Sequence, residues 1–174
     1  MKEIAHEATV VHVTLGTTEA NRTPGLYRTI LDALRDEPVE VVVSVGRPYV
    51  ADELGPVASN VHVHELVEHG HLLPRCSVVV SNGGYGTVMA SLACGVPGVV
   101  VPIQADQPRN AARASDLGFA VSVPRPEWSV DAIRSAVRAV LGGGSYRAAA
   151  IRAKADIEQL PSIEEIIPKV EALV

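Results

Sequence analysis

The chain has 174 residues, a net charge of −5 and a pI near 5.6. This acidic balance argues against nucleic acid or an anionic membrane as the main partner. The longest apolar run, 96–103, is too short to span a bilayer. With 47% hydrophobic but only 3% aromatic residues, the composition predicts one domain, 1–174, in which helices cover a buried sheet. A polar start and two cysteines without a CxxC pair predict a cytoplasmic protein with reduced thiols.

Apolar segments alternate with amphipathic ones along the whole chain, and each change of pattern predicts a strand or a helix. In chain order, we expect a strand over 10–15, a helix from Thr23-Pro24, strands over 39–45, 61–63 and 77–81, a helix over 84–94 ending at Gly95, a strand over 98–103, a helix over 107–117, a strand over 118–123, and helices over 133–141, over 145–159 and from Ser162.

The strands read as continuous apolar runs, and most are followed by a helix, which is typical of a parallel sheet covered on both faces. The predicted class is therefore α/β, a Rossmann-like parallel sheet of about six strands. In such sheets ligands bind beyond the carboxyl ends of the strands. The segments expected there are 16–18, 81–87 and 104–107.

A glycine cluster separates the fourth predicted strand from its helix. Gly83, Gly84 and Gly86 carry no Cβ, so a ligand can approach the backbone, and the helix start offers unpaired N–H groups. These properties favour a bound diphosphate, although a tight turn without a ligand would use the same residues. Thr17 and Thr18 follow the first strand, and their hydroxyls could reach a phosphate or form an ordinary polar turn.

Asp106 and Gln107 follow the fifth predicted strand. A carboxylate beside an amide offers several hydrogen-bonding sites, which suits the vicinal hydroxyls of a sugar. Alternatively, Asp106 caps the helix that begins near Pro108.

Other sites are less well supported by the residues. A dinucleotide fingerprint would need a third glycine where Met89 stands, so NAD binding is a weak alternative. Four histidines, His62, His64, His69 and His71, lack the cysteine or carboxylate partners of a metal site, and no metal is expected. His69 precedes the glycine strand and could contact a ligand. No G-x-S-x-G elbow is present.

The chain resembles the C-terminal, donor-binding half of family 1 glycosyltransferases of the GT-B fold, especially the bacterial branch that glycosylates macrolides and enediynes in antibiotic biosynthesis. The resemblance covers nearly the whole chain in an ordered set of motifs: VHVTLGTT (11–18), HLLPRCSVVVSNGGYGT (71–87), GVPGVVVP (95–102) and DQPRNA (106–111).

The resemblance implies a role for each part of the site. The donor diphosphate would be held by Thr17, Thr18, Asn82, Gly83, Gly84, Gly86 and Thr87. The donor sugar would be held by Asp106 and Gln107, and the base by Leu66, Val67 and His69. Asn82 stands where many members have a phosphate-binding histidine, and Ala90 where many have a ribose-binding glutamate.

The resemblance also implies a reaction. The family transfers a hexose from a UDP- or dTDP-sugar to a hydroxyl of a small natural product, with inversion and without a cofactor. The acceptor and the catalytic histidine belong to an N-terminal domain that matches nothing in this sequence, so no catalytic residue is assigned here. The expected partner is that domain or a partner subunit, and the chain could self-associate. The alternative is a non-catalytic accessory subunit, motivated by Glu68, Asn82 and Ala90.

Overall fold

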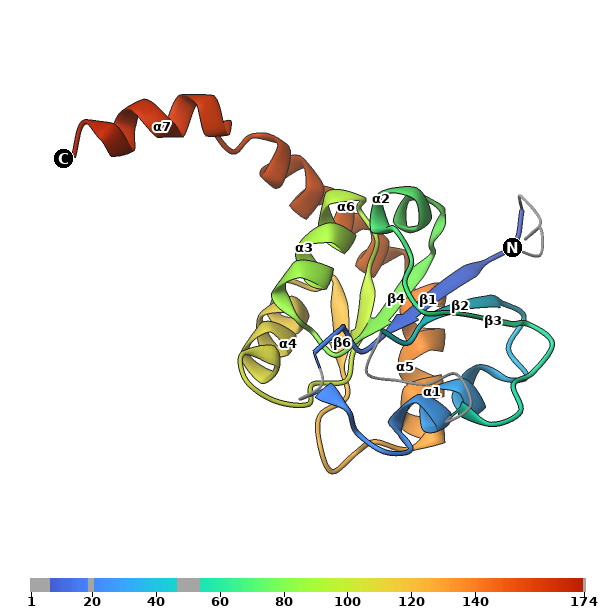
Figure 1. Ribbon diagram of the computed structural model, residues 1–174. Coiled ribbons are helices and arrows are strands. Elements are labelled where there is room, and N and C mark those ends of the chain that lie inside the picture. The colour runs from blue at the N-terminus through green and yellow to red at the C-terminus, as the bar shows by residue number, and fades with distance from the viewer. Residues whose placement is uncertain (1–6, 19–20, 47–53, 174) are drawn as a thin grey trace.

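The computed structural model describes residues 7–18, 21–46 and 54–173. Six parallel strands form one sheet in the order β3-β2-β1-β4-β5-β6 (Figure 1). The strands are β1 (Val10–Thr14), β2 (Glu40–Ser44), β3 (Val61–His64), β4 (Val78–Ser81), β5 (Gly98–Val100) and β6 (Ala120–Ser122). The predicted class, a parallel α/β sheet of about six strands, is confirmed.

The sheet order reverses between β1 and β4. β1 pairs with β2 on one side, with Val11 opposite Val41, and with β4 on the other, with Val11 opposite Val78. Connections therefore leave these two central strands in opposite directions. This is the switch point at which parallel α/β sheets bind ligands.

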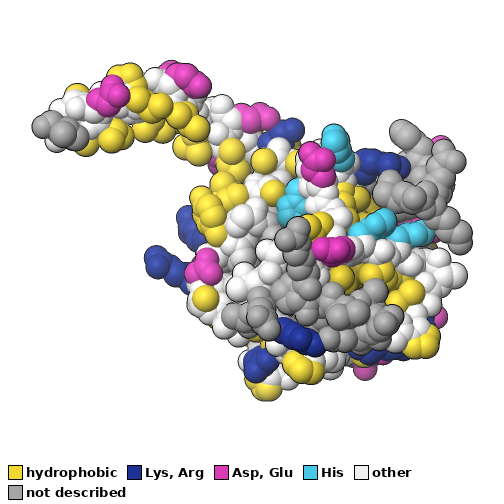
Figure 2. Space-filling view, in the orientation of Figure 1, with side chains coloured by type: hydrophobic (Ala, Val, Ile, Leu, Met, Phe, Trp, Pro, Cys, Tyr) yellow, Lys and Arg dark blue, Asp and Glu magenta, His cyan; other side chains and the backbone are white. Residues whose placement is uncertain are grey.

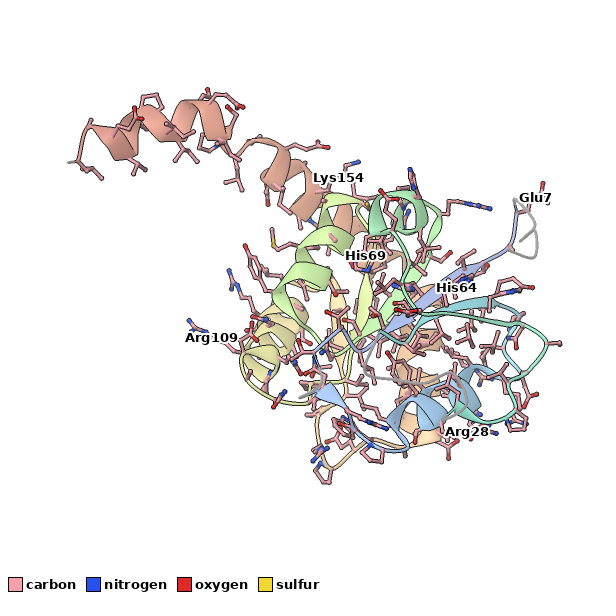
Figure 3. The ribbon with its side chains drawn as sticks, viewed as in Figure 1. Glu7, Arg28, His64, His69, Arg109 and Lys154 are labelled. Carbon is pink, nitrogen blue, oxygen red and sulfur yellow. The ribbon has the colours of Figure 1, made fainter. Side chains whose placement is uncertain are left out.

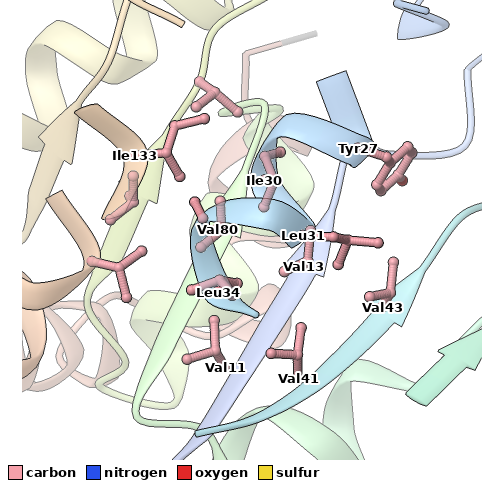
Figure 4. Close-up of a cluster of buried hydrophobic side chains, with 14 of the residues drawn as sticks. Val11, Val13, Tyr27, Ile30, Leu31, Leu34, Val41, Val43, Val80 and Ile133 are labelled. Atoms are coloured by element: carbon pink, nitrogen blue, oxygen red, sulfur yellow. The ribbon is translucent and has the colours of Figure 1, made fainter. Parts of the chain in front are cut away.

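Helices cover both faces of the sheet (Figure 1). The helices of the described chain are α1 (Leu26–Leu34), α2 (His69–Leu72), α3 (Tyr85–Ala93), α4 (Gln107–Asp116), α5 (Val130–Gly142), α6 (Gly144–Glu158) and α7 (Ile163–Glu171), with a 3-10 turn η3 (Leu73–Arg75) after α2. One face packs against α1 and α5, where Ile30, Leu34 and Ile133 meet the strand valines (Figure 4). The opposite face packs against α2, α3, α4 and α6.

Most predicted elements are present, and the differences are local. The helix expected from Thr23-Pro24 begins at Leu26, because Gly25 adopts a left-handed conformation (φ 79°) ahead of it. The short helix α2 was not predicted. Gly95 ends α3 as expected, with φ 65° and the N–H of Val96 donating to the carbonyl of Ser91. The last predicted helix, from Ser162, contains Pro168 and runs to Glu171 as α7.

The last helix, α7, projects from the body of the molecule (Figure 1). Its start is fixed by a capping box between Ser162 and Glu165, as predicted. An apolar stripe runs along it at helical spacing, formed by Ile163, Ile166, Ile167 and Val170, with exposures of 40–70%. Figure 2 shows this apolar surface on the projecting helix. Across the described residues, no helix is both long and apolar enough to cross a membrane.

Candidate functional site

A cavity of about 400 Å³ opens at the carboxyl ends of β1 and β2, against the first turn of α3. It is lined by Thr14, Gly16, Thr17, Ser44, Leu66, Val67, His69, Gly86 and Thr87. Six of these come from the three segments to which sequence analysis assigned a donor diphosphate and base, namely Thr17, Leu66, Val67, His69, Gly86 and Thr87. Its volume lies in the range of small-molecule sites. Thr18 is exposed and lies outside this lining.

The N-terminus of α3 forms one wall of this cavity. Helix geometry leaves the N–H groups of Tyr85, Gly86 and Thr87 without intrahelical partners and places the positive end of the helix dipole there. A Cβ built on Gly86 would meet nothing within 4 Å. The absence of a side chain at Gly86 therefore leaves the backbone open to a ligand, as a diphosphate would require.

The other two glycines of the turn serve its structure. Gly83 has φ 80°, and a Cβ on it would lie 2.5 Å from Cγ1 of Val100. Its N–H donates to Oγ of Ser81 at 3.2 Å, and the N–H of Gly84 donates to Oδ1 of Asn82 at 3.1 Å. These N–H groups are already paired, so the open donors lie at Gly86 and its neighbours.

Asn82 links the glycine turn to the end of β1. Its Nδ2 donates to the carbonyl of Leu15 at 2.8 Å, while its Oδ1 accepts from Gly84, and the residue is only 2% exposed. A histidine would not make both pairs in the same way, because its donor and acceptor nitrogens point in different directions from the ring, whereas the amide carries both groups on one carbon. In this structure the side chain of Asn82 holds the turn in place.

Asp106 and Gln107 lie side by side but in different environments. Gln107 is 4% exposed, and its Oε1 accepts from the N–H groups of Ile103 and Gln104 at 2.9 and 3.0 Å. Its Nε2 donates to Oδ1 of Asn21 at 2.9 Å. Asp106 is exposed at the first turn of α4, and it makes no side-chain cap.

Asn110 connects this pair to the glycine turn, and sequence analysis did not single it out. Its Nδ2 donates to Oδ2 of Asp106 at 2.8 Å and to the carbonyl of Gly83 at 2.9 Å. Asp106 is thereby held beside the glycine turn with its Oδ1 available. This contact could have been predicted from the motif DQPRNA, in which Asp106 and Asn110 are one helical turn apart.

The opposite wall comes from the segment between β3 and α2. Leu66 is 52% exposed, and His69 begins α2 with its ring against the cavity (Figure 3). Leu66 and Val67 also line a second, neighbouring cavity of about 360 Å³. Partial burial lowers the pKa of His69 below its usual value and so favours the neutral ring.

His12 lies directly beneath His69 in the centre of β1. The two ring centroids are 5.5 Å apart in an edge-on arrangement. His12 is completely buried, and burial lowers its pKa to about 4 despite a hydrogen bond to the carbonyl of Val42. No group of three or more metal-ligating side chains occurs in the part of the chain that the structure describes.

The sequence was compared with known families and structures. Residues 28–173 match the family described as "Erythromycin biosynthesis protein CIII-like, C-terminal domain". The chain belongs to this family. Sequence analysis, which identified the C-terminal half of a macrolide-type glycosyltransferase, is thus confirmed.

Curated relatives of this family member are named glycosyltransferases. The chain is 38% identical over 165 residues to the 4'-demethylrebeccamycin synthase of Lentzea aerocolonigenes, covering 95% of this chain and 38% of the relative. It is 30% identical over 168 residues to the 3-alpha-mycarosylerythronolide B desosaminyl transferase of Saccharopolyspora erythraea, covering 94% of this chain and 39% of that protein. The chain therefore spans well under half the length of these relatives.

Solved glycosyltransferases share the fold. A calicheamicin glycosyltransferase superposes with a TM-score of 0.85 at 28% identity, covering 95% of this chain and 42% of that one. Glycosyltransferase VinC in complex with dTDP gives 0.82 at 28% identity, covering 95% and 41%. The sheet described above is thus the fold of one half of these enzymes.

Proposed function

We propose that this chain is the donor-binding half of a glycosyltransferase that binds a UDP- or dTDP-sugar. The observation that carries the proposal is the cavity at the switch point, which joins the open N-terminus of α3 to Thr17 and to the segment 66–69. An anionic diphosphate suits the unpaired N–H groups of α3, and the apolar Leu66 and Val67 suit a base. The relative solved with dTDP supports a nucleotide of this class.

The proposed reaction moves a hexose from the donor to a hydroxyl of a natural product with inversion, in the cytoplasm and without a cofactor. Asp106 is placed to bind the donor sugar, since it is exposed and is held beside the glycine turn through Asn110. Gln107 has both ends of its amide bonded inside the protein, which leaves one N–H for a sugar. Its main role is to shape the loop that presents Asp106.

The proposed partner is the additional domain that the longer relatives contain. The apolar stripe of α7 has nothing packed on it among the described residues, and its spacing suits burial against another surface. In this proposal the additional domain supplies the acceptor site and the catalytic base. Without one, the same stripe would favour self-association.

A titration of the chain with UDP, dTDP and NAD, followed by NMR, tests the donor site. We expect UDP or dTDP to shift the amide signals of 83–87, while NAD leaves them unchanged. Gly86→Val should abolish the shifts, because its Cβ would enter the space now open to the ligand. Gly144→Val is the matched control, since Gly144 is also unobstructed in a first helical turn but belongs to α6. If neither UDP nor dTDP shifted these amide signals, the proposal would be refuted.

A second candidate is an accessory module that no longer binds a donor. It is favoured by Asn82, whose buried amide is bonded at both its oxygen and its nitrogen within the protein, and by Ala90, which packs against the core. Micromolar affinity for UDP or dTDP in the same titration would eliminate it.

A further inference from the structure

The centre of the sheet contains an unusual buried acceptor. Nδ1 of His12 lies 2.9 Å from the carbonyl oxygen of Val42. A carbonyl can only accept, so Nδ1 carries the proton, and in the neutral ring Nε2 is then a bare acceptor. Nε2 is fully buried and has no hydrogen-bond partner within the described chain. Because an unpaired buried acceptor costs free energy, its position requires an explanation.

His69 is the ring next to this acceptor. The centroids of the two imidazoles lie 5.5 Å apart, with the planes inclined by 75°. At this separation, facing ring atoms can lie about 3 Å apart, which is the length of one hydrogen bond. His69 also lines the donor cavity opposite α3, so its ring lies against both His12 and the cavity.

We propose that His12 is a positioning residue that fixes the tautomer of His69. In this arrangement the ring N–H of His69 rotates onto Nε2 of His12, completing a chain from His69 to His12 to the carbonyl of Val42. The second nitrogen of His69 then has no proton and faces the cavity as an acceptor. Second partners of this kind set the orientation and tautomer of functional histidines.

The arrangement has a consequence for the ligand, which rests on the proposed nucleotide function. A bare nitrogen pairs with an N–H donor, and uracil and thymine both present an imide N–H. Cytosine presents an unprotonated nitrogen at the same place, which would face the bare nitrogen of His69 without a proton between them. The pair His12–His69 therefore selects uracil or thymine over cytosine, since a site built to accept a hydrogen bond rejects an analogue that lacks the donor.

The first test needs no ligand. Long-range ¹H–¹⁵N spectra at pH 7.5 report the tautomer of each histidine. We expect one tautomer for His69 in the unmodified chain and a mixture in His12→Phe, which keeps a ring against His69 but removes Nε2. His71→Gln, which removes an exposed histidine outside the donor cavity, should leave His69 unchanged. A mixture in the unmodified chain would overturn the proposal even if His12→Phe failed to fold.

The second test compares UDP with CDP by calorimetry. The unmodified chain and His71→Gln should prefer UDP by tenfold or more, whereas the ratio should fall toward one in His12→Phe. An unchanged ratio, or an unchanged tautomer of His69, would overturn the proposal. If the unmodified chain bound neither nucleotide while His69 kept a tautomer that depends on His12, the proposed function would fail, and with it the base selection, while the positioning role would stand.

Discussion

Asn21 and Gln107 are 86 positions apart in the chain, yet Nε2 of Gln107 donates to Oδ1 of Asn21 at 2.9 Å. Gln104 donates to the same oxygen at 3.3 Å. The loop after β1 and the loop after β5 are thereby joined across the end of β4. This link fixes the edge of the site on which Asp106 is exposed.

Gln107→Ala should destabilise the fold, while Asp106→Ala should not. Removing the amide of Gln107 leaves the N–H groups of Ile103 and Gln104 without their acceptor, a loss of about 1–3 kcal/mol. Asp106 is exposed, so its loss should change the free energy of unfolding by no more than about 0.5 kcal/mol and instead weaken binding of a nucleotide sugar relative to the free nucleotide. Urea unfolding and calorimetry measure the two effects. Equal stability losses would contradict the assignment.

Gly83→Ala and Gly86→Ala should also differ. At Gly83 a Cβ meets Val100 and the backbone has φ 80°, so we expect a loss of at least about 2 kcal/mol in the free energy of unfolding. At Gly86 there is open space within a helix, so stability should be unchanged or rise by up to about 1 kcal/mol. Nucleotide affinity should fall in Gly86→Ala. Thermal unfolding and a UDP titration test both, and a stable Gly83→Ala would count against the packing argument.

Protonation of His12 should lower the free energy of unfolding as the pH is decreased. Its pKa is about 4 in the folded chain and 6.5 when unperturbed, so the unfolded state binds more protons between these values. The contribution is complete above pH 6.5, is lost as the pH falls toward 4, and levels off below it. The total is at most about 3 kcal/mol. Urea unfolding from pH 7 to 4 should show this loss in the unmodified chain and a smaller one in His12→Phe; parallel curves would contradict it. The pKa of His69 is also lowered, but His69 is present in both proteins, so it does not account for a difference between their curves.

Removing apolar groups from α7 should reduce self-association without unfolding the chain. Ile163 and Val170 are 70% and 55% exposed, so Ile163→Ser with Val170→Ser changes the surface rather than the core. Sedimentation velocity over a range of concentrations should show a larger monomer fraction. The matched control replaces Glu164 and Glu171, which are outside the apolar stripe, with serine. If all three proteins sedimented identically, the proposal that the apolar stripe of α7 promotes self-association would be contradicted.

The sheet could be predicted because its signals are local. Valine runs are visible in a short window, and Gly83 to Gly86 mark the turn before α3. Helix α2 could not be predicted, because HGHL is four residues long and shows no helical period. The start of α1 was displaced because a left-handed Gly25 intervenes after Thr23-Pro24.

The roles within the site were harder to predict, because they depend on distant partners. The sequence predicts that Asn82 binds the ligand, whereas in the structure its side chain bonds to the backbone of Leu15 and Gly84. The sequence likewise predicts that Gln107 binds the sugar, whereas in the structure its amide forms hydrogen bonds within the protein, including one to Asn21. His12 reads as one more strand residue, and only its contact with His69 distinguishes it. The binding roles of the twelve assigned residues remain predictions for the titrations above.

The walls of the donor cavity come from both sides of the β1–β4 seam. Thr17 and the segment 66–69 precede β4 in the chain, whereas Gly86 and Thr87 follow it. Neither half of the molecule carries all of these walls, so under the proposed function a nucleotide would bind only a chain whose two halves have already docked. The free energy of binding would then be added to the free energy of unfolding of the whole domain, so the ligand would slow any proteolysis that requires the two halves to separate.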